Sequence, residues 1–271
     1  MDVTITVNQE PSVAELFDLS GKTAIISGTS GWLGPSLAAA LAEAGANVVV
    51  TSRDRERAKQ WAAGLPRSKR QVHHGVRLDY ADEASIEDGF TEAVAAAGRI
   101  DLLVNNGHVG CGSDMTSVTA NEFNACLANA TGYFLLSRKL RDHAVSRGHR
   151  ANIIMMGSMY GVVGSYPDAY DGCETASPVA YHAVKGGIVH MTRHLAVYWA
   201  KDGVRVNCLS PGPFPGPTAN GELVERLIKK SPMGRMGRPD ELKGALVFLA
   251  SEASSYVTGQ NLLVDGGWTA W

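Results

Sequence analysis

The sequence predicts an α/β fold: a doubly wound parallel sheet of about seven strands with helices on both faces, within a single domain. Short β-branched runs alternate along the chain with Ala- and Leu-rich stretches of helical period. The runs are almost wholly apolar, as expected for strands that helices cover on both sides. With 271 residues and 45% hydrophobic content, the chain is long enough for one large core.

The expected elements follow one another without a repeat or a low-complexity linker. The strands are expected at 23–27, 47–51, 72–78, 100–104, 152–156, 204–209 and 261–264. The helices are expected at 35–44, 86–97, 122–147, 179–201 and 240–250. Two stretches rich in Pro and Gly, 164–178 and 211–221, escape the alternation. Because long irregular segments in such folds usually lie over a ligand, we expect substrate loops at 164–178 and 211–235.

The charge composition favours a small-molecule partner. Lys and Arg number 25 and Asp and Glu number 27, so no net positive field exists to attract nucleic acid or an anionic membrane. Residues 1–20 mix Asp, Glu, Asn and Gln among apolar residues, which is typical neither of a signal peptide nor of a membrane span. We expect an N-terminal extension at 1–20, a domain at 21–271 and a cytoplasmic location.

The four cysteines are widely spaced and follow no metal-ligand pattern. They are Cys111, Cys126, Cys173 and Cys208. We expect free thiols in a reducing cytosol. His190 and His194 lie one helical turn apart, but Met191 stands where a metalloprotease motif requires glutamate, so no metal site is expected.

A glycine-rich turn directly follows the first expected strand and precedes a helix that Pro35 opens. In this position glycines permit a tight turn and let backbone N–H groups approach a pyrophosphate, while the positive end of the helix faces the negative charge. A tight connection without a ligand is the alternative, because such a turn alone is a weak signal. The residues expected to bind a dinucleotide here are Gly28, Ser30, Gly31, Trp32, Leu33 and Gly34.

The second expected strand runs into Ser52 and Arg53. An enzyme selective for NAD usually carries a carboxylate at this point, whereas a guanidinium can bind the 2′-phosphate of NADP in a bidentate manner. We therefore expect Ser52 and Arg53 to bind the cofactor and NADP(H) to be preferred. Asp54 is adjacent, which keeps NAD(H) as an alternative, and an ordinary surface arginine is the other interpretation of Arg53.

Tyr181 and Lys185 lie one helical turn apart on the same face of an expected helix. A phenol titrates near pH 10, but a nearby ammonium stabilises the phenolate and lowers its pKa. Tyr181 could then serve as an acid or base near neutral pH. Since a Tyr and a Lys at this spacing are common and mostly structural, the pair needs further members to define a site.

Further motifs occur in the order in which one family carries them. They are Asn105-Asn106-Gly107-His108 after the fourth strand, Asn129 in a helix, Ser158 after the fifth strand, Tyr181 with Lys185, and Ser210-Pro211-Gly212-Pro213 after the sixth strand. In these motifs the sequence resembles the short-chain dehydrogenase/reductase family, from Gly21 to Gly267. The resemblance implies a Rossmann-like domain and an NAD(P)-dependent oxidoreductase that acts on CH–OH groups.

The resemblance also implies roles for individual residues. Tyr181 exchanges a proton with the substrate oxygen, while Lys185 tunes Tyr181 and hydrogen-bonds the nicotinamide ribose. Ser158 orients the substrate oxygen, and Asn129 anchors a proton-relay water. Together with Tyr181 and Lys185, further cofactor contacts are implied for Asp79, Asn105, Gly107, Pro211, Gly212 and Phe214.

Two motifs depart from the family pattern. The spacing of Gly28, Gly31 and Gly34 follows the longer, epimerase-like branch of the family. Gly107 and His108 replace Ala-Gly, which places an imidazole beside the cofactor or in the substrate pocket. A loop histidine without a ligand is the alternative for His108, because a single histidine carries little information.

The chain between Ser158 and Tyr181 is longer than in many members of the family, and both of its ends are tied to the site. Its aromatic and acidic side chains suit a polyhydroxylated ligand, because carboxylates accept hydrogen bonds from hydroxyl groups and rings offer flat apolar faces. These side chains are Tyr166, Asp168, Tyr170, Asp171 and Glu174. The residues expected to bind the substrate are Ser158, His108, Tyr160, Tyr170 and Tyr181. Sugars, polyols or sugar acids are the expected substrates, and a solvated surface loop is the alternative.

Other functions stay open at this point. They are a ketone or 3-oxoacyl-type reductase, an epimerase or dehydratase, and a non-catalytic binding module of the same fold. A serine hydrolase is excluded, because Met156 and Tyr160 flank Ser158 where that motif requires glycines. Apolar residues on more than one face of 122–147 and 179–201 predict a homo-oligomer, and the resemblance implies a tetramer.

Overall fold

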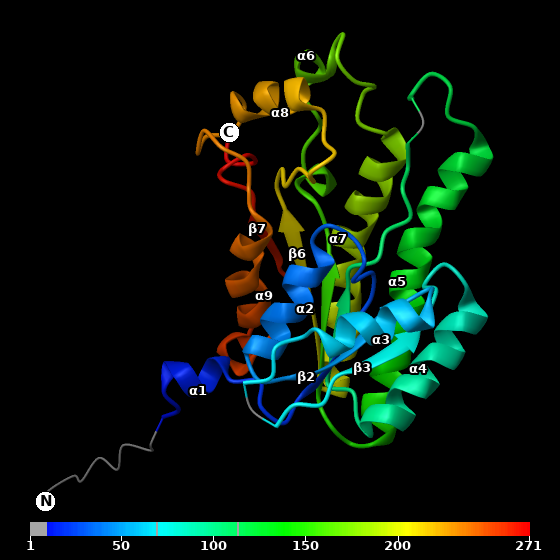
Figure 1. The fold of residues 1–271 in the computed structure, drawn as a ribbon, viewed down its shortest axis with the longest axis vertical. Helices are drawn as coiled ribbons and strands as arrows, with labels where there is room; N and C mark the ends of the chain where they lie inside the picture. The colour runs from blue at the N-terminus through cyan, green and yellow to red at the C-terminus, as the bar shows by residue number, and fades with distance from the viewer. Residues whose placement is uncertain (1–9, 69, 113) are drawn as a thin grey trace, which may run out of the picture.

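The computed structural model describes residues 10–68, 70–112 and 114–271 of the chain. Its strands form one parallel sheet of seven, in the spatial order β3-β2-β1-β4-β5-β6-β7 (Figure 1). They are β1 (Thr23–Ile26), β2 (Asn47–Ser52), β3 (His74–Arg77), β4 (Leu102–Asn105), β5 (Ala151–Met156), β6 (Val204–Pro211) and β7 (Asn261–Val264). The chain enters the sheet at β1 and extends it outward in both directions, so the predicted doubly wound sheet is confirmed.

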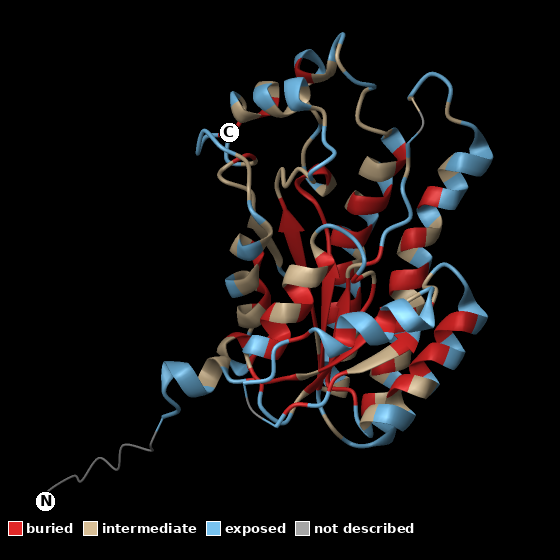
Figure 2. Ribbon diagram, viewed as in Figure 1, coloured by how far each residue is buried: buried red, intermediate tan, exposed pale blue. Residues whose placement is uncertain are grey.

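Two layers of helices cover the sheet (Figure 1). One layer holds α2 (Gly34–Glu43), α3 (Arg55–Ala63) and α9 (Lys243–Ala250), and the other holds α4 (Glu83–Ala97), α5 (Ala120–Ser146) and α7 (Val179–Trp199). Alternate side chains of β1 face the two layers: Ile25 belongs to the core beneath α4, α5 and α7, whereas Ala24 and Ile26 belong to the core beneath α2 and α9. The strands are therefore buried on both sides, as Figure 2 shows.

Polar caps fix where the helices begin. Asp82 accepts hydrogen bonds from the first N–H groups of α4, and Thr119 with Glu122 forms a capping box at the start of α5. Asp54 caps α3, a helix that the sequence pattern does not predict because its polar sequence buries only Ala58 and Ala62. The helix expected at 240–250 divides into a 3₁₀ turn, η3 (Pro239–Leu242), and α9.

Shorter helices complete the fold. They are α1 (Val13–Phe17), α6 (Pro167–Tyr170), α8 (Gly221–Ile228) and the 3₁₀ turns η1 (Met159–Gly161), η2 (Ala200–Asp202) and η4 (Glu252–Ser254). The expected extension at 1–20 is described only from residue 10, and residues 1–9 lie outside the described part. Within the described ranges, no helix is both long and apolar enough to cross a membrane.

The two expected substrate segments lie together beyond the carboxyl ends of the strands, where α6 and α8 meet (Figure 1). Nη1 of Arg226 donates to the carbonyl oxygen of Asp171 at 2.6 Å, and Nδ2 of Asn220 donates to the carbonyl oxygen of Cys173 at 2.9 Å. These bonds join the segment 164–178 to the segment 211–235.

The expectation of four free thiols is wrong for two of the cysteines. The structure joins Cys111 and Cys126 in a disulfide, with Cα atoms 5.5 Å apart. The chain after β4 turns back along α5, so residues 15 apart in sequence meet in space, which their spacing alone does not reveal. Cys173 and Cys208 are free thiols, and Cys208 is buried in β6.

Candidate active site

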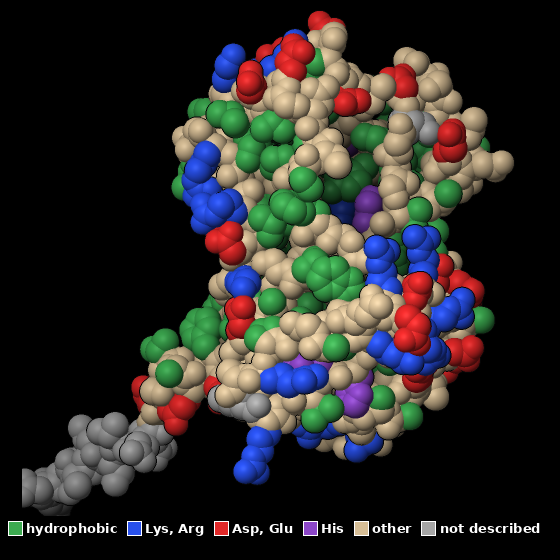
Figure 3. Space-filling model, viewed as in Figure 1, with side chains coloured by type: hydrophobic (Ala, Val, Ile, Leu, Met, Phe, Trp, Pro, Cys, Tyr) green, Lys and Arg blue, Asp and Glu red, His purple; other side chains and the backbone are tan. Residues whose placement is uncertain are grey.

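A cavity of about 780 Å³ lies at the carboxyl ends of β1, β2, β3 and β4. Its position is the switch point of the sheet, where the strand order reverses between β1 and β4 and ligands usually bind in this fold. Figure 3 shows the surface hollowed at this level, with histidine and apolar side chains within the hollow. The lining residues lie at the ends of four strands or just beyond them. After β1 they are Gly28, Ser30, Gly31, Trp32, Leu33 and Gly34, and at the end of β2 and beyond it they are Thr51, Ser52, Arg53, Asp54 and Arg57. After β3 they are Leu78, Asp79 and Tyr80, after β4 they are Asn106, Gly107, His108, Val109 and Gly110, and Phe214 follows β6.

The glycine loop presents bare backbone to the cavity. Gly28 has a φ of +68°, and a Cβ there would lie 2.7 Å from the amide nitrogen of Gly107. A Cβ at Gly34 would lie 2.7 Å from Cα of Thr29. The helix α2 that follows has Pro35 in its first turn and no side-chain cap, so its N-terminal N–H groups stay available for an anion. The loop therefore fits a dinucleotide pyrophosphate.

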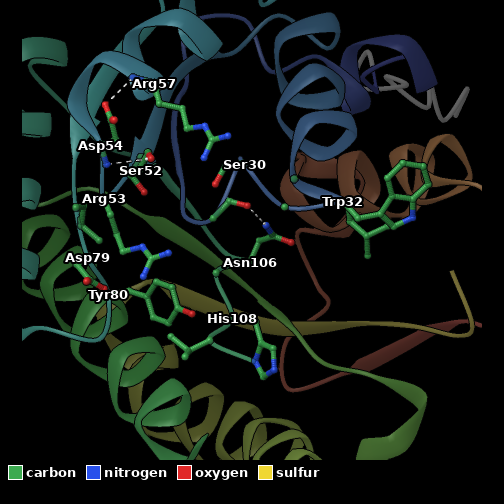
Figure 4. Close-up of a pocket in the computed structure, with 18 of the residues that line it drawn as sticks. Ser30, Trp32, Ser52, Arg53, Asp54, Arg57, Asp79, Tyr80, Asn106 and His108 are labelled. Atoms are coloured by element: carbon green, nitrogen blue, oxygen red, sulfur yellow. Dashed lines mark hydrogen bonds between the residues drawn. The ribbon is translucent and has the colours of Figure 1, made fainter. Parts of the chain in front are cut away.

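Two arginines line the cavity next to this loop. Figure 4 shows the guanidinium of Arg57 reaching toward Ser30 and that of Arg53 pointing toward the interior of the cavity. Asp54 lies between them, but its carboxylate accepts the backbone N–H of Arg57 at 3.0 Å and caps α3. The acid that kept NAD(H) as an alternative is thus engaged in helix capping, and the two guanidiniums fit a 2′-phosphate.

One expected cofactor contact lies elsewhere. The side chain of Asn105 is fully buried beneath the cavity, where its Nδ2 donates to the carbonyl oxygen of Tyr133 and to Oγ of Ser137. The neighbouring Asn106 lines the cavity instead, and its Nδ2 donates to the carbonyl oxygen of Gly28 at 2.9 Å. Asn105 is the last residue of β4 and is covered by α5, whereas Asn106 begins the loop that borders the cavity.

Phe214, in the turn after β6, lines the cavity. The expected cofactor contacts of Pro211 and Gly212, in the same turn, stay predictions. Gly212 lies against the turn after β7, where a Cβ would come within 2.5 Å of Cα of Asp265. The absence of a side chain at 212 therefore serves the packing of two neighbouring turns.

The structure brings Ser158, Tyr181 and Lys185 together. Ser158 follows β5, and its Oγ accepts the backbone N–H of Tyr160 at 3.1 Å. Its hydroxyl is close enough to Tyr181 to lower the pKa of that phenol. Lys185 is buried, with Nζ 5.6 Å from the centre of the Tyr181 ring. The same Nζ donates to the carbonyl oxygen of Met156 at 2.8 Å, which fixes the ammonium beneath the tyrosine. His108 extends this group toward the cavity, because its ring meets the Tyr181 ring edge-on with centroids 5.2 Å apart.

Burial is the main cause of the shifted pKa values of Tyr181, Lys185 and His108. It raises the pKa of Tyr181, and the hydrogen bond from Ser158 opposes that rise. The sequence predicted that Lys185 would lower the pKa of Tyr181. In the structure that pKa is raised, so the prediction is wrong. Burial lowers the pKa of Lys185 to about 8, and burial together with the charge of Lys185 lowers the pKa of His108 to about 4. At neutral pH, His108 is thus a neutral imidazole that can both donate and accept a hydrogen bond.

Asn129 holds the loop that follows β4. Its Oδ1 accepts the backbone N–H of Val109 at 2.7 Å, and its Nδ2 donates to the carbonyl oxygens of Val109 at 3.1 Å and of Cys126 at 2.7 Å. Oδ1 also accepts the hydroxyl of Tyr80 at 3.1 Å. The amide is thus fully engaged with protein groups, and its role as anchor of a relay water stays a prediction.

Aromatic side chains gather beside Tyr181. Tyr160 stacks on His182 with centroids 4.6 Å apart, and its hydroxyl lies 2.9 Å from that of Tyr170. Tyr166 and Tyr170 pack with Tyr160 and Tyr181 in one apolar cluster. The expected substrate residues Tyr160 and Tyr170 therefore lie next to the reacting group.

The acidic side chains of the same segment face outward. Asp168 forms an ion pair of 2.5 Å with Lys230 at the surface. Asp171 and Glu174 line a separate shallow hollow with Asp168, away from Tyr181. These three carboxylates are exposed, so the interpretation that they suit a ligand of the site is not supported by their orientation. Within the described ranges, no three His, Cys, Asp or Glu residues cluster as a metal site.

A glycine loop at the switch point of a parallel sheet, next to a buried serine and lysine and a partly buried tyrosine, is the arrangement of a dinucleotide-dependent dehydrogenase. Residues 30–269 match the family model described as enoyl-(acyl carrier protein) reductase. The chain belongs to the short-chain dehydrogenase/reductase family, as its motifs predicted.

Curated proteins and solved structures resemble the chain over nearly its whole length. D-threitol dehydrogenase of Mycolicibacterium smegmatis is 34% identical over 275 residues, covering 98% of this chain and 99% of the relative. A short-chain type dehydrogenase/reductase of Mycobacterium marinum has 34% identity and a TM-score of 0.84, covering 96% of this chain and all of the other. A gluconate 5-dehydrogenase of Burkholderia cenocepacia, solved with NADP and tartrate, has 30% identity, a TM-score of 0.85 and the same coverage.

Replacing Lys185 with methionine is expected to stabilise the fold at neutral pH. Holding a pKa of about 8 instead of the usual 10.5 costs about 3 kcal/mol at pH 7, and the lost bond to Met156 offsets about 1 kcal/mol of the gain. The cost is fully present below pH 8 and falls as the pH rises toward 10.5. Urea unfolding should therefore show Lys185→Met about 2 kcal/mol more stable than wild type at pH 7 and nearly equal at pH 9.5.

Lys201→Met, which removes an exposed lysine, is the matched control for this experiment. A Lys185→Met protein that is less stable at pH 7, by an amount that does not change with pH, would contradict a costly buried ammonium.

Proposed function

We propose that the protein is an oxidoreductase that moves hydride between NADP(H) and the alcohol carbon of a polyol, sugar or sugar acid. The observation that carries the proposal is the group formed by the partly buried Tyr181 with the buried Ser158 and Lys185. His108 joins this group to a cavity that the glycine loop borders, so a nicotinamide ring and a substrate carbon can meet there.

The proton chemistry belongs to Tyr181. Its hydroxyl gives a proton to the carbonyl oxygen in reduction and takes one from the alcohol in oxidation, while the hydrogen-bonded Ser158 holds the same oxygen. Lys185 places a positive charge beneath the ring, which stabilises the phenolate when the proton leaves. The nicotinamide, when bound, supplies or accepts the hydride. Every protein group in this scheme positions a reactant or moves a proton.

The preference for NADP(H) is supported by two guanidiniums and by the engagement of the neighbouring acid. Arg53 and Arg57 would hold the 2′-phosphate, with Ser30 and Ser52 beside them. Asp54, which would otherwise select the ribose hydroxyls of NAD(H), caps α3. The gluconate 5-dehydrogenase of similar structure was solved with NADP.

A polyhydroxylated substrate is supported by the walls of the site. The phenols of Tyr160 and Tyr170 and the neutral imidazole of His108 offer donors and acceptors for hydroxyl groups, and the tyrosine rings offer flat apolar faces. Similar proteins act, by their names, on D-threitol and on gluconate. The exposed carboxylate of Asp168 pairs with Lys230, so it would not repel a sugar acid beside Tyr181.

A ketone or acyl-chain reductase is the second candidate, since the matching family model is described as an enoyl-(acyl carrier protein) reductase. Polar hydroxyl groups at the inner wall, from Tyr160 and Tyr170, favour the polyol over a long apolar chain. An epimerase or dehydratase and a non-catalytic module stay less favoured alternatives, because the complete Ser158, Tyr181 and Lys185 group suits simple hydride transfer.

The proposal is tested by a panel of polyols, sugars, sugar acids and ketones, followed by nicotinamide absorbance. Wild type should turn over members of the first three classes, and Tyr181→Phe should lose at least about 100-fold in kcat, because the proton donor is removed. The NADPH dissociation constant, measured by fluorescence, should change less than about twofold. Tyr256→Phe removes an exposed hydroxyl and serves as the control. Equal turnover by Tyr181→Phe would overturn the mechanism.

The cofactor assignment has its own test. Arg53→Ala should raise KM for NADPH by about 10- to 100-fold, because a charge-assisted pair with phosphate is lost. KM for NADH should change less than about threefold, since NADH lacks that phosphate. Arg238→Ala, at an exposed arginine outside the cavity, is the control. Unchanged KM values for both cofactors would refute the role of Arg53.

The homotetramer and the cytoplasmic location stay predictions. Apolar side chains that face solvent on α5 and α7 support an assembly: Leu127 is 36% exposed, and Val197 and Tyr198 are 75% and 61% exposed. Light scattering at micromolar concentration should give four times the mass of the 28.7 kDa chain. A monomer mass would exclude the assembly.

A further inference from the structure

Tyr80 links the cofactor cavity to the loop that carries His108. It follows Asp79 after β3 and lines the cavity (Figure 4). Its hydroxyl donates to Oδ1 of Asn129 at 3.1 Å. Burial raises the pKa of Tyr80, so this hydroxyl keeps its proton and remains a donor throughout the neutral range.

The ring of Tyr80 occupies the space above Gly107. A Cβ at Gly107 would lie 2.5 Å from Cδ1 and 3.1 Å from Cζ of that ring, closer than carbon atoms pack. The backbone of Tyr80 is held equally closely against α5, because a Cβ at Gly132 would lie 3.0 Å from the Tyr80 carbonyl carbon. The ring therefore cannot withdraw freely, and Tyr80 and Gly107 fit only as a pair. This pairing accounts for a glycine where the sequence departs from Ala-Gly.

The contacts continue from Asn129 to the reacting centre. Its Oδ1 accepts the N–H of Val109, and its Nδ2 donates to the carbonyl oxygen of the same residue. Val109 is thus held on both sides of its backbone. The preceding residue, His108, places its ring against Tyr181. A change in the orientation of the Asn129 amide would therefore move the imidazole relative to the reacting hydroxyl.

We propose that Tyr80 is a positioning residue: its hydroxyl orients the Asn129 amide, which holds Val109 and so sets His108 against Tyr181. The ring of Tyr80 takes the place of the missing side chain at Gly107 and closes the floor of the cofactor cavity. One side chain thus serves loop order through its hydroxyl and nucleotide binding through its ring. The turnover and NADPH-binding measurements rest on the proposed function, whereas the exchange measurement does not.

The first variant is Tyr80→Phe, which keeps the ring and removes the hydroxyl. Amide exchange of the segment 107–112, measured by mass spectrometry without nucleotide, should become about fivefold faster, the effect of one lost hydrogen bond. In the turnover assay, kcat/KM for the polyol that wild type oxidises fastest should fall by about fivefold. The NADPH dissociation constant should stay within about twofold of wild type, because the ring remains. Tyr256→Phe, at a fully exposed tyrosine, should match wild type in all three measurements.

The second test uses the pair. Gly107→Ala should weaken NADPH binding by at least about tenfold, since its methyl group displaces the ring. The double variant Tyr80→Val with Gly107→Ala should recover NADPH binding to within about threefold of wild type, while segment 107–112 keeps the fast exchange of Tyr80→Phe. Recovered NADPH binding with fast loop exchange would show that the ring of Tyr80 serves binding and that its hydroxyl serves loop order.

Wild-type exchange in Tyr80→Phe would overturn the role of the hydroxyl, and a double variant that binds NADPH no better than Gly107→Ala would overturn the pairing of ring and glycine. A wild-type protein that binds NADPH but oxidises no polyol would count against the proposed function alone, because exchange and nucleotide binding still decide the inference. If wild type does not bind NADPH, amide exchange of segment 107–112 in Tyr80→Phe still decides whether the Tyr80 hydroxyl orders this loop.

Discussion

The burial of the Lys185 ammonium is the constraint on which the rest of the site depends. A charge withdrawn from water is costly, and its bond to the carbonyl oxygen of Met156 and its position near the rings of Tyr181 and Tyr133 compensate for part of that cost. Burial lowers the pKa of His108, and the charge of Lys185 lowers it further, so this imidazole stays neutral beside the buried cation. The fold supplies the enclosing walls, because β5 and α7 meet at this point.

The sheet and most of the helices could be predicted from the sequence, because buried parallel strands and helices with an apolar face leave clear periodic patterns. All seven strands lie where β-branched runs predict them, within a few residues at their ends. Helices such as α3 and α8 escaped prediction because they bury few side chains and are held by polar caps: Asp54 for α3 and Asn220 for α8. Local hydrogen bonds of this kind leave little trace in hydrophobic periodicity.

The site was predictable where a motif fixes both residue type and backbone position, as for Ser158, Tyr181, Lys185 and the glycine loop. It was not predictable where orientation decides the role. Asn105 and Asn106 differ only in the side of β4 that they face, and the carboxylate of Asp168 points to solvent because Lys230, far along the chain, attracts it. The disulfide between Cys111 and Cys126 likewise depends on the path of the chain between them.

Arg226 and Asn220 bind the segment 211–235 to the segment 164–178. The guanidinium of Arg226 binds backbone carbonyl groups at the end of α6, including that of Asp171, while Asn220 holds the carbonyl oxygen of Cys173 from the other segment. Any displacement of one segment must break these bonds or carry the other along. The two segments are therefore cross-linked into one layer at this end of the sheet.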